Sequence, residues 1–277
     1  MENWWLIWAV GGLALWALAN VLDNYFTEDS YLDEYTGLAI SALFNFFPVV
    51  FILLFISPEI NRAQSLGLLA AFSAGILLMT TYLAYFKCLF SLNDNVALQV
   101  AWGLSSPLIL LWGKIFLGDD LTSLQYTGAG LILLGVLFLD FRKFSFAGRG
   151  GMVSYLFWAL LMNLAYSSQQ ILMKVAYEIE KIPFWTAFLY FTLGQLLVGL
   201  VSVFLRWKIV ANQRAAFVSM IKRFWIVFIV AEIVEQMAAL STQKAVEATP
   251  FISFYGALEA GMRSEERRVG KECRSRW

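Results

Sequence analysis

The sequence predicts an all-α integral membrane protein that crosses the bilayer many times. Three observations predict this fold class: long apolar segments, charged residues that lie between those segments, and a helical hairpin with a very short turn. Hydrophobic residues make up 60% of the chain and charged residues only 14%. A soluble protein of this size would instead show amphipathic helices with a charged face. About nine apolar segments are present, at 4–22, 37–57, 66–86, 96–117, 124–139, 151–173, 183–205, 224–243 and 248–262.

The hairpin at residues 96–139 is the clearest single element. Its first apolar run, 96–117, is long enough to cross a hydrocarbon layer, which takes about 20 helical residues. A turn at 118–123 leads directly into the second run, so the two helices must cross as an antiparallel pair. The second run carries Gly128, Gly130 and Gly135. Because glycine removes side-chain bulk, these positions predict that another helix packs closely there.

The chain divides into two halves with a similar plan. Residues 1–142 hold five apolar segments, and residues 151–262 hold four or slightly more. The link between them, Arg142 to Gly150, is basic and contains glycine, which is typical of a linker. An odd number of spans in each repeat would place the halves in opposite orientations. We therefore predict two inverted transmembrane repeats, an arrangement in which transporters bind their substrate between the halves.

The last residues differ from the rest of the chain. Residues 263–277 contain six basic and three acidic side chains, and they cut the ninth apolar segment short. Their sequence resembles translated vector sequence, so we expect 263–277 to be non-native and the second repeat to be truncated. The alternative is a genuine basic tail that follows a tilted or re-entrant helix.

Polar side chains inside the predicted spans are the candidate functional residues, because such residues usually face the bundle interior or a water-filled cavity. In the sixth segment they recur at steps of four, three and four, which places them on one face of a helix. Three other segments carry similar stripes. The candidate substrate-binding or coupling residues are Asn20, Asn24, Gln99, Trp102, Ser106, Asn163, Ser167, Gln170, Lys174, Glu232, Glu235 and Gln236.

Glu232 and Glu235 are the sharpest candidates, because an ionised carboxylate is costly in the middle of a span. One interpretation is a proton-coupling or cation-binding pair, opposed by Lys174 or Lys244; the other is a structural ion pair. For the polar residues of the sixth segment, the alternative is hydrogen bonding between helices. For Trp102 and Tyr166, the alternative to lining a cavity is simple packing.

Other kinds of chemistry leave no signature in the chain. The sequence contains no histidine, no phosphate-binding loop and no zinc-ligand spacing. We therefore expect no catalytic residues, no cofactor, no metal site and no nucleic-acid partner. A membrane enzyme that uses histidine is excluded, whereas one that uses only carboxylates is not.

The hairpin motifs resemble a known family. Ser105-Ser106-Pro107-Leu108, then 116–121 and 125–136, are similar to the repeat signature of EamA-type proteins of the drug/metabolite transporter superfamily. Asp119 stands where that family usually has glutamate, and Ala257-Leu258-Glu259 resembles its Pro-Leu-Glu word. The resemblance implies ten helices in two five-helix repeats, of which about nine are present here.

The sequence and this resemblance together predict a multi-pass transporter in the cell membrane or inner membrane. It would move a small metabolite or amphipathic organic compound by alternating access, driven by a gradient or by exchange. The expected partners are the lipid bilayer, a small-molecule substrate and, as a candidate coupling ion, the proton; a homo-oligomer remains open. The alternatives are a membrane scaffold or assembly subunit, and a non-histidine membrane enzyme acting on lipid-linked substrates.

Overall fold

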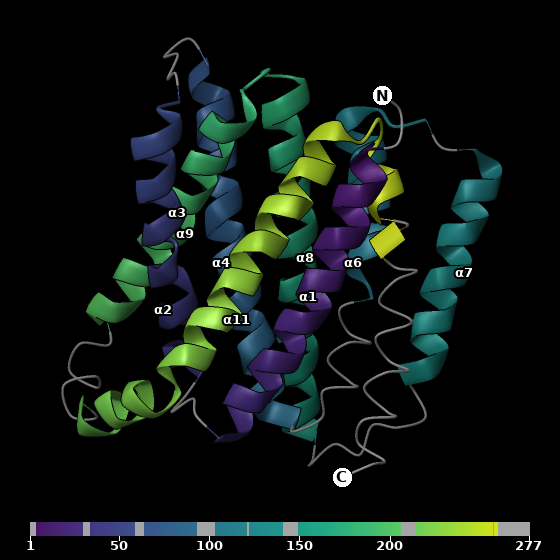
Figure 1. The fold of residues 1–277 in the computed structure, drawn as a ribbon. Coiled ribbons are helices and arrows are strands. Elements are labelled where there is room, and N and C mark those ends of the chain that lie inside the picture. Colours follow the sequence, from purple (N-terminus) through teal and green to yellow (C-terminus); the bar gives the residue numbers. More distant parts are fainter. Residues whose placement is uncertain are drawn as a thin grey trace.

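The protein is a bundle of long helices (Figure 1). The computed structural model describes residues 4–29, 34–58, 64–92, 103–120, 122–140, 149–205, 214–256 and 258–259. Within these ranges the regular elements are helices and no strand occurs. They are α1 (Trp4–Asp29), α2 (Glu34–Phe44), α3 (Phe46–Phe51), the π-helical turn η1 (Ile52–Ile56), α4 (Ser65–Leu92), α6 (Ser105–Trp112), the π-helical turn η3 (Gly113–Leu117), α7 (Ser123–Asp140), α8 (Arg149–Glu178), α9 (Phe184–Leu205) and α11 (Arg214–Ala248).

Length and composition confirm the predicted fold class. Five stretches among the described residues are long and apolar enough to cross a membrane: Trp4–Leu22, Leu38–Ile56, Ser65–Cys88, Phe184–Phe204 and Trp225–Ala248. Helix α8 is longer than a single crossing requires, at 30 residues. Its buried polar stripe makes it less apolar than these five. The chain is an all-α, multi-pass integral membrane protein.

Helix α4 lies at the centre of the bundle. It packs on α8 along one side and on α9 along another, while α1 packs along α11 and α2 against α9 (Figure 1). Each of these pairs joins the first 92 residues to a helix that begins after residue 148. The main interfaces therefore lie between the two predicted halves and not within either of them.

The hairpin turn forms as predicted. Helix α6 continues into η3, which ends at Leu117, and α7 begins at Ser123. Gly118 closes the helical end with a left-handed backbone (φ 71°), a conformation that glycine adopts without steric cost. In Figure 1, α7 stands at the edge of the bundle, and its main contact with described residues is with α6.

The predicted close packing at the hairpin glycines is wrong as far as the described residues extend. None of their atoms lies within 4 Å of a Cβ built on Gly128 or Gly130. The surroundings of Gly135 lie outside the described side chains. Close approach occurs instead between α4 and α9, where a Cβ on Gly75 would lie 2.0 Å from the carbonyl oxygen of Phe191. Glycines in a predicted helix show where side-chain bulk is missing. They do not show whether another helix packs against that position.

Large apolar side chains cover the outer surface of the bundle. Phe46, Phe47, Phe51, Leu54 and Phe55 of α3 and η1 are all more than half exposed. In a soluble protein such a surface would aggregate, whereas hydrocarbon tails solvate it. This face of the bundle is suited to contact with lipid.

Candidate functional site

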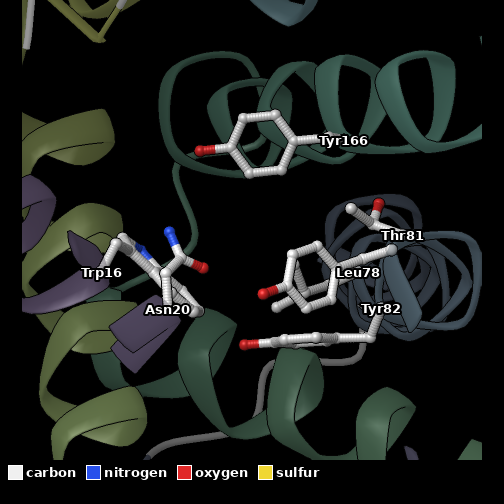
Figure 2. Close-up of a pocket in the computed structure, with 7 residues that line it drawn as sticks. Trp16, Asn20, Leu78, Thr81, Tyr82 and Tyr166 are labelled. Carbon is white, nitrogen blue, oxygen red and sulfur yellow. The ribbon is translucent and has the colours of Figure 1, made fainter. Parts of the chain in front are cut away.

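A cavity opens between three helices that are far apart in the sequence. Trp16 and Asn20 of α1 line it on one side, and Tyr166 of α8 lines it on another. Helix α4 contributes Leu78, Thr81, Tyr82 and Tyr85. The space among these side chains, including its open mouth, is about 380 Å³. Figure 2 shows the hydroxyls of Tyr82 and Tyr166 and the side-chain amide of Asn20 turned toward the same central space.

The α4 wall follows directly from helical geometry. Residues 78, 81, 82 and 85 are spaced three, four and seven apart, which places them on one face of the helix. Tyr82 and Tyr85 are buried, as is Tyr166 across the cavity. The Trp16 and Tyr82 rings meet with their centroids 6.1 Å apart and their planes tilted by 49°. Aromatic rings therefore form most of the wall.

The cavity lies between the middle and one end of the spans that line it. Trp16 and Asn20 are in the second half of the apolar stretch 4–22, and the α4 residues extend from the middle of 65–88 toward its end. In Figure 1, α1 runs from the N-terminus at the top of the bundle toward its lower edge.

Trp16 is held in place by α11. Its indole Nε1 donates a hydrogen bond to Thr242 Oγ1 at 3.0 Å. One turn earlier on α1, a Cβ added to Gly12 would lie 3.0 Å from both the backbone nitrogen and the hydroxyl of Thr242. The missing side chain at Gly12 thus allows α1 and α11 to approach closely enough for this bond. The cavity wall on α1 is positioned by the C-terminal half of the chain.

Glu235 lies behind the cavity wall. The Tyr82 hydroxyl donates to Glu235 Oε2 at 3.3 Å, and both side chains are buried. The contact is longer than a typical O–H···O hydrogen bond, which measures about 2.7–2.8 Å. It joins α4 to α11 and places the Glu235 carboxyl group next to the Tyr82 phenol, which lines the cavity.

Glu232 and Gln236 bind a second helix. The Ser41 hydroxyl donates to Glu232 Oε1 at 3.1 Å, and Gln236 Nε2 donates to Asn45 Oδ1 at 3.4 Å. The two bonds are four residues apart on both segments, so the end of α2 and α11 run parallel here. The carboxyl pair predicted on one face of α11 therefore divides between two neighbours, with Glu232 turned to α2 and Glu235 to α4.

Asn45 interrupts the second span where this contact is made. Pro48 has no backbone N–H, so the carbonyl of residue 44 loses its normal helical donor. Asn45 itself bonds back to the Ala42 carbonyl at 3.3 Å, which frees the carbonyl of Ser41. The Asn45 side-chain amide satisfies that carbonyl at 3.0 Å. A break between α2 and α3 is thus stabilised by the same residue that accepts from Gln236.

The polar stripe of α8 is buried as predicted, but its residues have separate partners. Asn163 donates to the Ala159 carbonyl at 2.6 Å within its own helix. Ser167 accepts from the indole Nε1 of Trp112 at 3.2 Å, which ties α6 to α8. Gln170 is buried, and its Oε1 has no hydrogen-bond partner among the described residues. None of these three residues lines the cavity.

Lys174 does not oppose the α11 carboxylates, and that part of the prediction is wrong. Its ammonium forms an ion pair with Glu178 Oε1 at 2.6 Å, one turn later on α8. It also donates to the carbonyls of Val246 and Thr249 at the end of α11. A cation placed against the last carbonyls of a helix satisfies acceptors that have no partner within that helix. Lys244, the other proposed counter-ion, pairs instead with Glu247 at 2.8 Å.

Asp119 joins the hairpin turn to the C-terminal half. It is buried, and its Oδ2 accepts from the Ser253 backbone nitrogen at 3.1 Å and from the Ser253 hydroxyl at 2.5 Å. Residues 252–256 form a short helical stretch, so Asp119 satisfies a donor in its first turn. The residue singled out by the hairpin motif thus acts across the two halves.

The remaining predicted site residues have different outcomes. Asn20 lines the cavity, and Ser106 is buried on α6 away from it. The side chain of Asn24, and all of Gln99 and Trp102, lie outside the described part of the chain. Sequence reasoning missed Thr81, Tyr82 and Tyr85. Their signal was two tyrosines three residues apart within an apolar span, where a phenol hydroxyl needs a partner.

The fold and the cavity define a polytopic helical membrane protein with a polar and aromatic space inside its bundle. Among the described residues, no group of three or more histidine, cysteine, aspartate or glutamate side chains could hold a metal ion. Residues 3–140, which comprise the first predicted repeat, match the EamA-like transporter family. The chain belongs to this family of membrane transporters, as its hairpin motifs predicted. None of the curated proteins compared with the chain matches it.

Proposed function

We propose that this protein carries a small organic molecule across the membrane by exposing the cavity between α1, α4 and α8 to the two sides in turn. The observation that supports this most strongly is that both halves of the chain contribute residues to the cavity wall. Two walls come from the first half of the chain and one from the second, and Thr242 and Glu235 of α11 bond to wall residues. A site between halves is the arrangement in which relative motion of two repeats opens one side and closes the other.

Besides the extensive packing of α4 on α8 and α9, side-chain hydrogen bonds cross between the halves at this site. Trp16–Thr242, Tyr82–Glu235 and Ser41–Glu232 are single hydrogen bonds between side chains. Such bonds between membrane helices contribute about 0.6 kcal/mol on average. Exchanging these three bonds for other partners therefore costs little.

The energy source in this proposal is a gradient or exchange with a second solute. Glu232 and Glu235 are the candidate sites for a coupling proton in this proposal, because both carboxyl groups are buried between helices near the cavity. Asn20 lies in the cavity wall and contacts the substrate directly in this proposal. The stripe of Asn163, Ser167, Gln170 and Lys174, together with Ser106 and Gln236, positions the helices around that wall.

Cysteine accessibility tests alternating access without knowledge of the substrate. In a chain with Cys88 and Cys273 replaced by alanine, Thr81→Cys places a thiol in the cavity. Thr80→Cys is the matched control, because Thr80 is adjacent on α4 and does not line the cavity. Both threonine hydroxyls bond to the carbonyl four residues earlier, so the two substitutions remove equivalent interactions. Membrane-impermeant thiol reagents are then added to either side of sealed vesicles.

A transporter predicts that the Thr81→Cys thiol reacts from both sides, whereas the Thr80→Cys thiol reacts from neither. A scaffold or an enzyme without a transmembrane pathway predicts reaction of Thr81→Cys from at most one side. Reaction from one side only, under all ion gradients applied, would contradict alternating access.

A further inference from the structure

Resting on the proposed function, we infer that the cavity takes an organic cation: an amine or ammonium ion that carries apolar substituents. Three features of the cavity carry this inference. They are the number of aromatic rings in its wall, the carboxyl group bonded to one of those rings, and the absence of a basic side chain among the described residues that line it.

Aromatic rings form four of the seven lining positions, namely Trp16, Tyr82, Tyr85 and Tyr166. The face of an aromatic ring carries partial negative charge, and it attracts a cation within about 6 Å of the ring centre. Removal from water strengthens this attraction, and the three tyrosines are at most 6% exposed. The remaining wall, including Leu78, is suited to the apolar substituents of such a ligand.

The oxygen atoms that face the cavity favour the same class of ligand. Figure 2 shows the phenol oxygens of Tyr82 and Tyr166 and the amide of Asn20 turned toward one central space. Phenol and amide oxygens accept hydrogen bonds from an ammonium N–H, and they also stabilise a quaternary nitrogen through their dipoles.

In its deprotonated state, Glu235 supplies the negative charge. Its Oε2 accepts from the Tyr82 hydroxyl, so the phenol shares part of the carboxylate charge and its ring becomes a better partner for a cation. Glu235 does not itself line the cavity. It is therefore a positioning residue that acts on the ligand through Tyr82, and neither a neutral nor an anionic ligand would gain from it.

The described lysines of the helices that line the cavity have other partners. Lys87, two residues after Tyr85 on α4, lies over the rings of Tyr35 and Trp158, 4.6 and 5.9 Å from their centres. None of the described residues that line the cavity is a lysine or an arginine. Lys174, the buried lysine of α8, is held by Glu178 and by two carbonyls of the α11 end, and Lys244 is held by Glu247. Lys244 also lies over the ring of Phe184, 3.5 Å from its centre. An anionic ligand in the cavity would meet the field of Glu235 with no cation among the lining residues to balance it.

Pairs of ligands that differ only in charge test this inference. Choline and 3,3-dimethylbutan-1-ol have the same shape, and phenethylammonium and 2-phenylethanol have nearly the same size. Binding of all four is measured by calorimetry on the full chain in lipid nanodiscs. We expect at least one charged member to bind about tenfold or more tightly than its neutral counterpart, which is a typical effect of a desolvated cation–π contact.

Two variants locate the effect. Glu235→Gln and Tyr82→Phe both break the carboxylate–phenol bond but keep the shape of the wall, so each should reduce the preference for the charged ligand several-fold. Glu247→Gln is the matched control, because it removes the same charge from the same helix at a residue bonded to Lys244 and not to the cavity wall. The control should keep the full preference.

The outcomes separate this inference from the proposed function. Equal binding of charged and neutral members overturns the cation class, while reaction of Thr81→Cys from both sides would still support transport. Binding of no ligand also overturns the inference. A preference for cations that survives Glu235→Gln and Tyr82→Phe unchanged overturns the role given to Glu235.

Discussion

Gly194 of α9 lies against Gly75 of α4 so closely that a Cβ built on Gly194 would be 3.2 Å from the Gly75 Cα. The same Cβ would lie 2.1 Å from the carbonyl oxygen of Phe72. Real Cβ atoms do not approach backbone to such distances, so this crossing exists only because both residues lack side chains. Close backbone contact is a common way to gain packing energy between membrane helices.

Gly75→Ala should therefore destabilise the protein strongly. The added methyl group would meet backbone of α9, which cannot move as a flexible side chain would, so we expect a loss of at least about 2–3 kcal/mol. Gly128→Ala on α7 is the control, since none of the described atoms lies near that position. Thermal unfolding in detergent, followed by size-exclusion chromatography, measures both. Equal melting temperatures for the two variants would contradict the crossing.

The bond between Ser41 and Glu232 should be visible as a coupling energy. In a double-mutant cycle of Ser41→Ala and Glu232→Gln, we expect about 0.5–1.5 kcal/mol of coupling, because the hydroxyl donates directly to the carboxyl group. Unfolding in mixed detergent micelles gives the four free energies. Ser41→Ala combined with Glu235→Gln serves as the control, since Glu235 bonds to Tyr82 instead, and these two changes should be additive within about 0.5 kcal/mol.

Two neighbouring aspartates of the hairpin turn should differ sharply. Asp119→Ala removes a buried acceptor from both donors of Ser253, and we expect a loss of about 1–2 kcal/mol, as for removal of a helix N-cap. Asp120 is exposed and pairs with Lys114 at the surface, where solvent screens the ion pair. Asp120→Ala should leave the melting temperature unchanged. A similar loss for both variants would mean that Asp119 has no special role.

Lys174→Met should lower stability by about 1–3 kcal/mol. The change removes the donor to two carbonyls at the α11 end and leaves Glu178 without its partner. The exposed Lys181 of the following loop provides the control substitution, Lys181→Met. Hydrogen exchange at residues 246–249 should increase in Lys174→Met alone. Unchanged protection there would exclude a capping role for Lys174.

The fold class was predictable because it depends on composition and span length, which local sequence contains. Helix α8 shows which structural features the local sequence does not predict. The spacing of Asn163, Ser167, Gln170 and Lys174 correctly indicated one buried face. It did not indicate the partners, since Trp112 and Val246 are brought to that face by helices 55 and 72 residues away along the chain.

The cavity was harder to predict for a related reason. In a soluble helix the contrast between polar and apolar residues identifies the inner face. In α4 almost every residue is apolar, so the face that carries Leu78, Thr81, Tyr82 and Tyr85 shows little contrast with the face that meets lipid. The same loss of contrast explains why Gly128 and Gly130 suggested a packing face that the described residues do not provide.

The position of α4 between α8 and α9 has a consequence for biosynthesis. A ribosome completes α4 before any residue of α8 or α9 exists, and nascent chains lengthen at about 5–20 residues per second. During that interval Gly75, Tyr82 and the other residues of the α4 interfaces face lipid or the insertion machinery. Ser41 likewise has to enter the membrane before Glu232 is synthesised. The N-terminal helices thus enter the membrane before the helices that they pack against have been synthesised. They can reach their final packing only after the second half of the chain has been inserted.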